Sequence, residues 1–256
     1  MELSLIKETA QEIFQSSKTV ALTGAGISAE SGIPTFRGSQ GLWSKYDPAE
    51  FADVEAFLRN PGKVWHMIKE LILIIEAADP NPAHLALAEL ERRGLLHCVI
   101  TQNVDNLHQR GGSKKVIEYH GTNERLYCLD CSARYPRKAI SLETLPPRCQ
   151  CGGVVRPDVV FFGEPIPLEA RLTAEAEAES CQLMLVVGTS AVVYPAGQLP
   201  VMAKSAGAKV IEFNMEETPL TGYISDRLLK GRAAQVLPSI VDEIKKLELG
   251  NHDPSW

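Results

Sequence analysis

The stretch Lys18-Thr-Val-Ala-Leu-Thr-Gly-Ala-Gly-Ile-Ser-Ala29 decides how the chain folds. Its first five residues form a short, β-branched apolar run that is typical of a buried strand. The residues from Thr23 to Ala29 match the pattern G-x-G-x-x-A, in which glycines let backbone amides approach a pyrophosphate at the start of a helix. A glycine-rich turn without any ligand would explain the same residues equally well. The stretch therefore predicts a strand, a tight turn and a candidate phosphate site.

Similar apolar runs recur along the chain and alternate with segments of helical periodicity. This alternation is typical of an α/β protein whose parallel sheet is covered on both faces. We expect strands at 97–101, 116–119, 182–187 and 209–213, and helices at 3–14, 82–93, 167–179 and 195–205.

Two regions interrupt the alternation of strands and helices. Residues 24–78 begin with the glycine-rich loop and continue as helical segments, and residues 124–156 are rich in proline and cysteine. We interpret both regions as insertions that form a smaller lobe beside the main sheet.

The composition excludes several classes of protein. Of 256 residues, 45% are apolar and 23% are charged, which is typical of a folded globular protein. The net charge of −6 argues against nucleic acid as a main partner. The longest apolar runs, such as Leu71 to Ile75, have five residues and are too short to span a membrane, and no signal-peptide pattern is present. We therefore expect a cytoplasmic protein that binds neither membranes nor nucleic acids.

The six cysteines indicate a metal site rather than disulfides, because nothing points to export. Cys98 and Cys181 stand alone in apolar surroundings, and we expect them to be core thiols. The other four are spaced as ligands for one tetrahedral, structural zinc ion, although unligated thiols are the alternative and a single residue separates the last two where two are usual. These four are Cys128, Cys131, Cys149 and Cys151.

Polar residues follow four of the expected strands, at the sheet edge where α/β proteins bind ligands. Helix capping or chain reversal would explain several of them without a ligand. A lone histidine in such a place is more often structural, but a strand end next to a flexible glycine favours a catalytic base. The four segments are Thr101 to His108, Tyr119-His120-Gly121, Gly188-Thr-Ser190 and Asn214-Met-Glu216.

The segment after the first turn does not continue as a dehydrogenase would. Gly32, Pro34 and Gly38 break any long helix and place Phe36 and Arg37 on a loop, which we interpret as a mobile flap over a ligand. A plain dehydrogenase is disfavoured, because its strand–helix–strand unit would not be broken here.

Together these motifs resemble the sirtuins of the prokaryotic type, a family of NAD-dependent protein lysine deacylases. The resemblance extends from Leu22 to about Ala233 and follows the family's motif order. It rests on Gly24 to Gly38, Thr101 to Asp105, His120-Gly121, the four clustered cysteines, Phe161-Phe-Gly-Glu164, Gly188-Thr-Ser190 and Asn214.

The resemblance implies a Rossmann-like domain with a smaller inserted lobe that holds a zinc module and a helical module. The expected units are 1–23, 79–123 and 157–249 for the large domain, 24–78 for the cofactor-binding loop and helical module, and 124–156 for the zinc module. One zinc ion per chain and NAD as co-substrate are implied. NAD and an acyl-lysine protein or peptide would enter the cleft between the lobes.

Individual roles are likewise implied by the resemblance. His120 is the expected general base, with Asn103 and Asp105 beside the nicotinamide. The expected NAD contacts are Gly24, Ala25, Gly26, Ser28, Phe36, Arg37, Gln102, Asn103, Asp105, Gly188, Thr189, Ser190, Asn214 and Ala233. The expected substrate contacts are Val160, Phe161, Phe162, Gly163, Glu164, Val193 and Tyr194.

The implied reaction transfers the acyl group from lysine to ADP-ribose and releases nicotinamide and O-acyl-ADP-ribose. Transfer of ADP-ribose to protein is an alternative with nearly the same motifs, and a non-catalytic zinc-ribbon binding module is an alternative of another class. In sirtuins that prefer succinyl groups, a tyrosine and an arginine hold the acyl carboxylate. Here Ile68 and Leu71 stand at those positions, so we expect neutral acyl groups.

Overall fold

The computed structural model describes residues 3–36 and 41–251 and is built around one parallel sheet. Its six strands have the order β3-β2-β1-β7-β8-β9, and each neighbouring pair is parallel. The strand order reverses between β1 and β7, which is where sheets of this kind bind ligands. The strands are β1 (Thr19–Thr23), β2 (Cys98–Thr101), β3 (Val116–Glu118), β7 (Leu183–Val187), β8 (Lys209–Asn214) and β9 (Arg227–Lys230).

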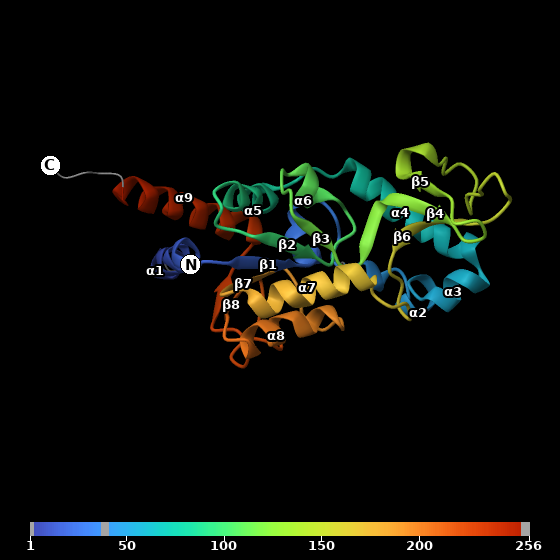
Figure 1. Cartoon of the computed structure of the whole chain (residues 1–256). Helices are drawn as coiled ribbons and strands as arrows, with labels where there is room; N and C mark the ends of the chain where they lie inside the picture. The colour runs from blue at the N-terminus through green and yellow to red at the C-terminus, as the bar shows by residue number, and fades with distance from the viewer. Residues whose placement is uncertain (1–2, 37–40, 252–256) are drawn as a thin grey trace.

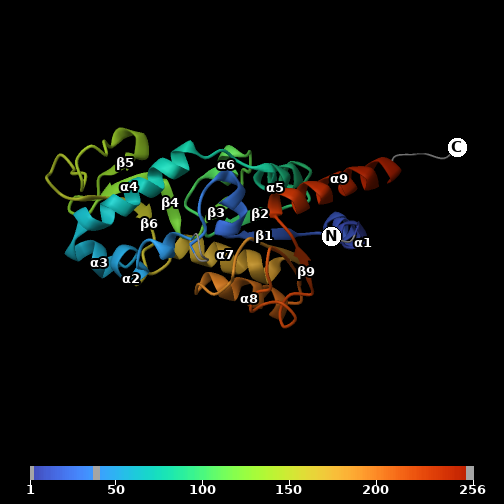
Figure 2. The ribbon, with the colours of Figure 1, turned by 180° about the vertical axis from the view of Figure 1, so that it is seen from behind.

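Helices cover both faces of this sheet (Figures 1 and 2). The α5 and α9 helices pack on one face together with α1, and α7 and α8 pack on the other. These helices are α1 (Leu3–Gln15), α5 (Pro82–Arg92), α7 (Leu168–Ser180), α8 (Leu199–Ser205) and α9 (Ala233–Asn251), and a short α6 (Leu107–Arg110) follows β2.

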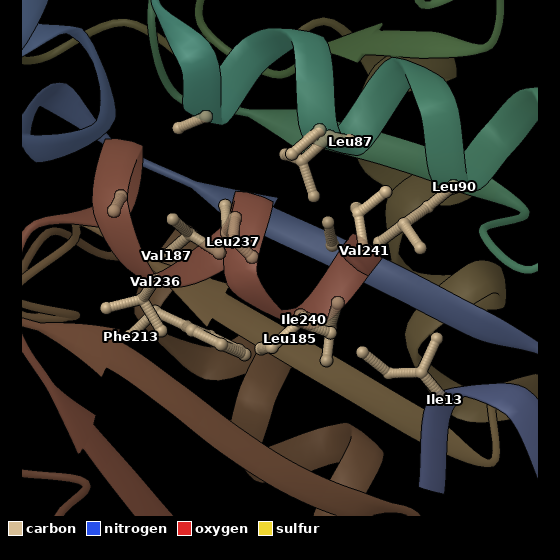
Figure 3. Packing of buried hydrophobic residues seen from close by; sticks show 14 of the residues in the cluster. Ile13, Leu87, Leu90, Leu185, Val187, Phe213, Val236, Leu237, Ile240 and Val241 are labelled. Carbon is tan, nitrogen blue, oxygen red and sulfur yellow. The ribbon is translucent and has the colours of Figure 1, made fainter. Parts of the chain in front are cut away.

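The core forms as two apolar layers because successive strand residues point to opposite faces. In β7, Leu185 and Val187 belong to the layer under α5 and α9, whereas Met184 and Val186 belong to the layer under α7 and α8. Figure 3 shows the first layer, in which side chains of α5 and α9 meet those of β7 and β8. A sheet buried on both faces explains why its strands appear in the sequence as continuous apolar runs.

The expected strands and helices of the main sheet are confirmed, with bounds that shift by one or two residues. Two details differ. The segment expected as a helix at 195–205 begins with a 3-10 turn at Ala196–Gln198, and the sequence did not predict β9. β9 begins with Arg227 and ends with Lys230, and its edge position lets both charged side chains stay partly exposed.

A smaller lobe stands beside the carboxyl ends of the main strands (Figure 1). It contains an antiparallel sheet in the order β5-β4-β6 and three helices around a separate apolar core. Trp65 is completely buried there, and its indole nitrogen donates to the Val155 carbonyl oxygen at 2.9 Å. The elements are α2 (Pro48–Phe51), α3 (Val54–Arg59), α4 (Pro61–Ala77), β4 (Gly121–Cys128), β5 (Arg134–Pro136) and β6 (Val155–Val159).

The division into structural units stays a prediction. Two of the expected boundaries fall inside continuous strands. The boundary at 123/124 lies within β4, and the boundary at 156/157 lies within β6. These two strands pair along their length, with a bulge between Thr122 and Leu126. If the chain divides in this way, the expected zinc module and main domain share two continuous strands.

The two isolated cysteines are confirmed as core thiols. Cys98 lies in β2 and Cys181 directly follows α7, and both belong to the apolar layer under α7 and α8. Burial raises the pKa of Cys98 to about 12 and that of Cys181 to about 11, so both thiols stay protonated and unreactive.

In the described part of the chain, every helix is too short or too polar to cross a membrane.

Gly121 begins β4 with φ +78°, and a Cβ atom there would lie 2.1 Å from the Asp158 carbonyl oxygen. Gly207 also has a positive φ, +97°, but a Cβ atom there would have no neighbour within 4 Å. We expect Gly207→Ala to cost about 1–2 kcal/mol from backbone strain alone. Gly121→Ala should cost roughly 1–3 kcal/mol more, because β6 must move. Urea unfolding of both variants tests this, and equal destabilisation would contradict it.

Candidate functional site

A cavity of about 910 Å³ opens where the strand order reverses, between the main sheet and the smaller lobe. Two glycine loops form its floor. The Gly24 amide donates to Val187 and the Gly26 amide donates to the Gly188 carbonyl oxygen at 2.8 Å. A Cβ atom on Gly26 would lie 2.8 Å from the Gly188 Cα, so only glycine allows this approach.

The structure brings nearly all of the sequence-predicted site residues to this one cavity. Two of them, Ser28 and Asp105, do not reach its wall, and Arg37 lies outside the described residues. The residues that do line it are Gly24, Ala25, Gly26, Phe36, Gln102, Asn103, His120, Val160, Phe161, Phe162, Gly163, Glu164, Gly188, Thr189, Ser190, Val193, Tyr194, Asn214 and Ala233.

Ser28 and Asp105 lie directly beneath the cavity in a buried polar network. The Asn103 amide donates to the Gly24 carbonyl and to the Ser28 hydroxyl, both at 3.1 Å. The Ser28 hydroxyl in turn donates to Oδ2 of Asp105 at 2.6 Å. The network therefore fixes the Asn103 side chain against the first glycine loop.

Asp105 serves the network and a helix at the same time. Its Oδ1 accepts from the Leu107 amide at 3.0 Å at the start of α6, so the capping interpretation of this residue also holds. Burial raises the pKa of Asp105, and the hydrogen bond from Ser28 opposes this shift only in part. A carboxyl group with a raised pKa next to a ligand cavity is typical of a functional site.

His84 completes the network and was not predicted from the sequence. Its Nδ1 accepts from the Asn81 amide at 3.2 Å, which places the ring proton on Nε2, 3.4 Å from the Ser28 hydroxyl. Burial lowers the pKa of His84 to about 4, so the ring is neutral at pH 7. In the sequence, only its position three residues after the helix-starting Asn81 marks it out.

His120 is positioned as a base. Its Nδ1 lies 3.0 Å from the Gln102 carbonyl oxygen, which can only accept, so the proton sits on Nδ1 and Nε2 keeps a free lone pair. Burial lowers the pKa of His120, and the hydrogen bond to Gln102 opposes this shift. The ring is therefore neutral near pH 7, the state in which an imidazole can take a proton.

The carboxyl ends of β2, β7 and β8 meet through one threonine. Thr189 accepts a hydrogen bond on its hydroxyl from Gln102 at 3.0 Å and on its carbonyl from Asn214 at 3.0 Å. Below the loop after Asn214, the fully buried Glu212 accepts from the hydroxyls of Thr218, Thr221 and Ser225. This loop also lines the cavity and is held rigidly by those bonds.

The segment Phe161 to Glu164 forms a turn that is fixed by a buried arginine. Arg156 is 2% exposed, and its guanidinium makes two hydrogen bonds of 2.7 Å to the Glu164 carboxylate and one to the Val159 carbonyl. The same guanidinium lies 4.5 Å from the centre of the Phe161 ring. The Phe162 carbonyl oxygen accepts a hydrogen bond from the Val54 amide at the start of α3, at 3.0 Å.

Phe36, the described residue of the predicted flap, lines the cavity. Its ring stacks on Trp43 at 5.1 Å between centroids, and Trp43 in turn contacts Phe162 at 6.5 Å. Trp43 lines the cavity and was not predicted as a site residue. Phe36 is therefore held against the smaller lobe by its contact with Trp43.

The four clustered cysteines are well placed to bind zinc. Their sulfur atoms all lie within 4.8 Å of one another, and the pairs Cys128–Cys151 and Cys131–Cys149 are each 3.5 Å apart. Tetrahedral zinc with bonds of about 2.3 Å would need sulfur separations of about 3.8 Å. The short spacing between Cys149 and Cys151 is thus compatible with both being ligands.

The fold and cavity define a nucleotide-binding α/β protein with a four-cysteine module. A family model described as the Sir2 family matches residues 24–195. The NAD-dependent protein deacylase of Pyrococcus abyssi is 49% identical over 249 residues, which is 95% of this chain and 99% of that protein. The chain belongs to the Sir2 family. This confirms the resemblance to sirtuins and the Rossmann-like fold class.

Two solved structures illustrate what relatives bind. A Sir2 homologue in complex with NAD has a TM-score of 0.88 and 45% identity, covering 96% of this chain and 95% of that one. A Sir2 histidine-to-alanine mutant with a deacetylated p53 peptide and 3'-O-acetyl ADP-ribose has a TM-score of 0.89 and 40% identity. The match covers 93% of this chain and 98% of that one.

The neutral state of buried His84 predicts how stability depends on pH. The folded pKa is about 4 and the ordinary value is 6.5, so between these values the unfolded chain binds the extra proton. The contribution of His84 to the free energy of unfolding should therefore be fully present above pH 6.5. It should fall by up to about 3 kcal/mol as the pH drops toward 4. His108, whose pKa is also lowered by burial, adds to this loss, and Asp105 with its raised pKa opposes it.

Urea unfolding at pH 7 and pH 5 measures the effect. His84→Gln should have a smaller difference between the two pH values than the wild type, whereas the exposed His66→Gln should match the wild type. An unchanged pH dependence in His84→Gln would show that another group is responsible.

Proposed function

We propose that this chain is an NAD-dependent protein lysine deacylase, in which the acyl group of lysine is transferred to ADP-ribose. The observation that carries the proposal is the single cavity that joins the two glycine loops, the buried Asn103 network and the free Nε2 of His120. Family membership and the deacylase name of the Pyrococcus abyssi relative support it. NAD supplies an anomeric carbon that accepts the acyl oxygen when nicotinamide leaves.

The chain's own residues would hold NAD along the cavity in an extended arrangement. Gly24, Gly26 and Gly188 let the backbone approach the phosphates without a side chain in the way. Asn214 and the rigid loop after it suit the adenosine end. Asn103 and Asp105 would face the nicotinamide end, where Asp105 acts through the network rather than at the cavity wall.

His120 would take the proton at the reacting centre. Its Nε2 is free, and the Gln102 carbonyl keeps the other nitrogen protonated. This orientation lets the ring accept a proton from a ribose hydroxyl and so make that oxygen a nucleophile. Phe36, stacked on Trp43, would cover the ribose and exclude water during this step.

The acyl-lysine peptide would lie between two exposed segments of the cavity mouth. Phe162 is 45% exposed and Tyr194 is 67% exposed, and they come from the Phe161–Glu164 turn and the loop after β7. A peptide that pairs by backbone with these segments would be an added strand. Arg156 and Glu164 would then act as positioning residues for that strand.

The zinc module would be structural. Four thiolate ligands fill the tetrahedral coordination of zinc and leave no position for water. His120 directly precedes β4, whereas Cys128 is the last residue of β4 and the other three cysteines gather around it, so the length of this strand separates the metal site from His120. Zinc would therefore stabilise the smaller lobe without taking part in the acyl transfer.

The role of His120 can be tested by substitution. His120→Ala should lose at least about 10²-fold in kcat while NAD binding survives, because the ring acts during the chemistry. The matched control is the exposed His66→Ala on α4. Mass spectrometry of an acetyl-lysine peptide with and without NAD measures the product and separates acyl loss from ADP-ribosylation. Unchanged turnover in His120→Ala would remove this residue from the mechanism.

The cavity wall also bears on which acyl groups the enzyme accepts. Ile68 and Leu71 lie about one turn apart on α4, and both line the cavity, as Met67 does. A carboxylate on the acyl chain would meet apolar side chains there, and an unpaired buried carboxylate costs several kcal/mol.

We therefore expect kcat/KM for succinyl-lysine to be at least about 100-fold below that for acetyl-lysine in the same peptide. Butyryl-lysine should be competitive with acetyl-lysine, because each added methylene contributes up to about 0.8 kcal/mol of apolar burial. The double variant Ile68→Tyr with Leu71→Arg should reduce the difference in kcat/KM between acetyl-lysine and succinyl-lysine. Equal rates for succinyl and acetyl groups in the wild type would refute the argument.

A further inference from the structure

Asn123 is a buried residue in the cavity wall, and its side-chain nitrogen has no hydrogen-bond partner among the described residues. It lies on β4, its residue is 6% exposed, and its side-chain nitrogen is fully buried. Neither side-chain atom forms a hydrogen bond with any residue in the described ranges, although its backbone amide donates to the Val104 carbonyl at 3.0 Å. A buried donor without a partner costs about 1–3 kcal/mol, so this amide is costly in the free protein.

Several apolar residues line the same cavity as Asn123. Val104 is its direct neighbour through the backbone bond, and it lines the same cavity. Further along β4, Leu126 packs in one apolar cluster with Met67 and Ile68 of α4, whereas Leu71 packs in another cluster with Leu107. Asn123 lines the same cavity as Met67, Ile68 and Leu71 of α4.

The backbone of β4 is irregular at this residue. The register with β6 shifts between Thr122 and Leu126, so Asn123 belongs to a bulge rather than to the regular ladder. Bulges next to a ligand cavity re-aim a side chain. The amide is thus held at the cavity by the local backbone, and no described side chain satisfies it there.

We propose that Asn123 is a specificity-determining residue that binds a hydroxyl group carried by the acyl chain of the substrate, so that the enzyme favours hydroxyacyl-lysine over the matching plain acyl-lysine. The inference rests on the proposed deacylase function. A hydroxyl group is the neutral partner that both accepts from the Asn123 nitrogen and donates to its oxygen. The aliphatic part of such a chain would pack against Met67, Ile68 and Leu71.

A charged acyl group would not fit this arrangement equally well. The side chains of Met67, Ile68, Leu71, Val104 and Pro157, which line the cavity, carry no positive charge. An amide can share a hydrogen bond with a carboxylate but cannot neutralise it, so the desolvation cost of the charge remains. The proposal therefore agrees with the expected rejection of succinyl groups.

The test compares butyryl-lysine and 3-hydroxybutyryl-lysine in one peptide, at saturating NAD, for the wild type and Asn123→Leu. Leucine has the same branched shape and the same number of side-chain heavy atoms as asparagine, although its two methyl groups are bulkier, and it removes both polar atoms. The ratio of kcat/KM for the hydroxylated over the plain substrate should be roughly 2- to 10-fold higher in the wild type than in the variant, which is the usual worth of one hydrogen bond. Asn123→Val serves as the second variant if leucine prevents folding.

The matched control is Gln235→Leu, which removes an exposed amide on α9 and should leave the substrate ratio at the wild-type value. Equal ratios in the wild type and Asn123→Leu would overturn the proposal. So would a change in nicotinamide inhibition that is the same for both substrates, because the amide would then face nicotinamide. Absence of any NAD-dependent turnover by the folded wild type, with acetyl-lysine included, would refute the deacylase function itself.

Discussion

The backbone contact between two glycine loops is the constraint on which the rest of the site depends. Gly26 donates to Gly188 across the point where the strand order reverses, and Gly188 has φ +59°. This contact closes the gap between the ends of β1 and β7, so the cavity floor consists of backbone. Side chains from β2 and β8 can then reach over that floor, as Gln102 and Asn214 do by bonding to Thr189.

Beneath the floor, polar groups are buried together instead of singly. Asn103, Ser28, Asp105 and His84 each find a partner within the network, which is the condition under which buried polar groups are tolerated. A fully connected network holds one geometry, and it fixes the Asn103 side chain in that geometry at the cavity wall. Asn123 differs because its side-chain nitrogen is buried without a hydrogen-bond partner among the described residues.

The sequence allowed the main sheet, the glycine loop, the cysteine cluster and His120 to be predicted, because each depends on local pattern or on a family motif. His84 could not be found in this way, since its role comes from Ser28, which is far away in the chain and close only after folding. Ser28 and Asp105 were expected at the cavity wall, and only packing shows that they lie below it. The pairing of β4 with β6 is also a tertiary property.

β4 begins directly after His120 and ends at Cys128, so a single strand of eight residues joins the proposed base to the four-cysteine cluster. Its length fixes how far the two centres stand apart, and no hinge separates them. Protein engineers who exchange zinc modules between relatives would therefore need to retain this strand and its partner as one unit. The four-cysteine cluster is attached through β4 to the part of the cavity that holds His120, so a change in one would displace the other.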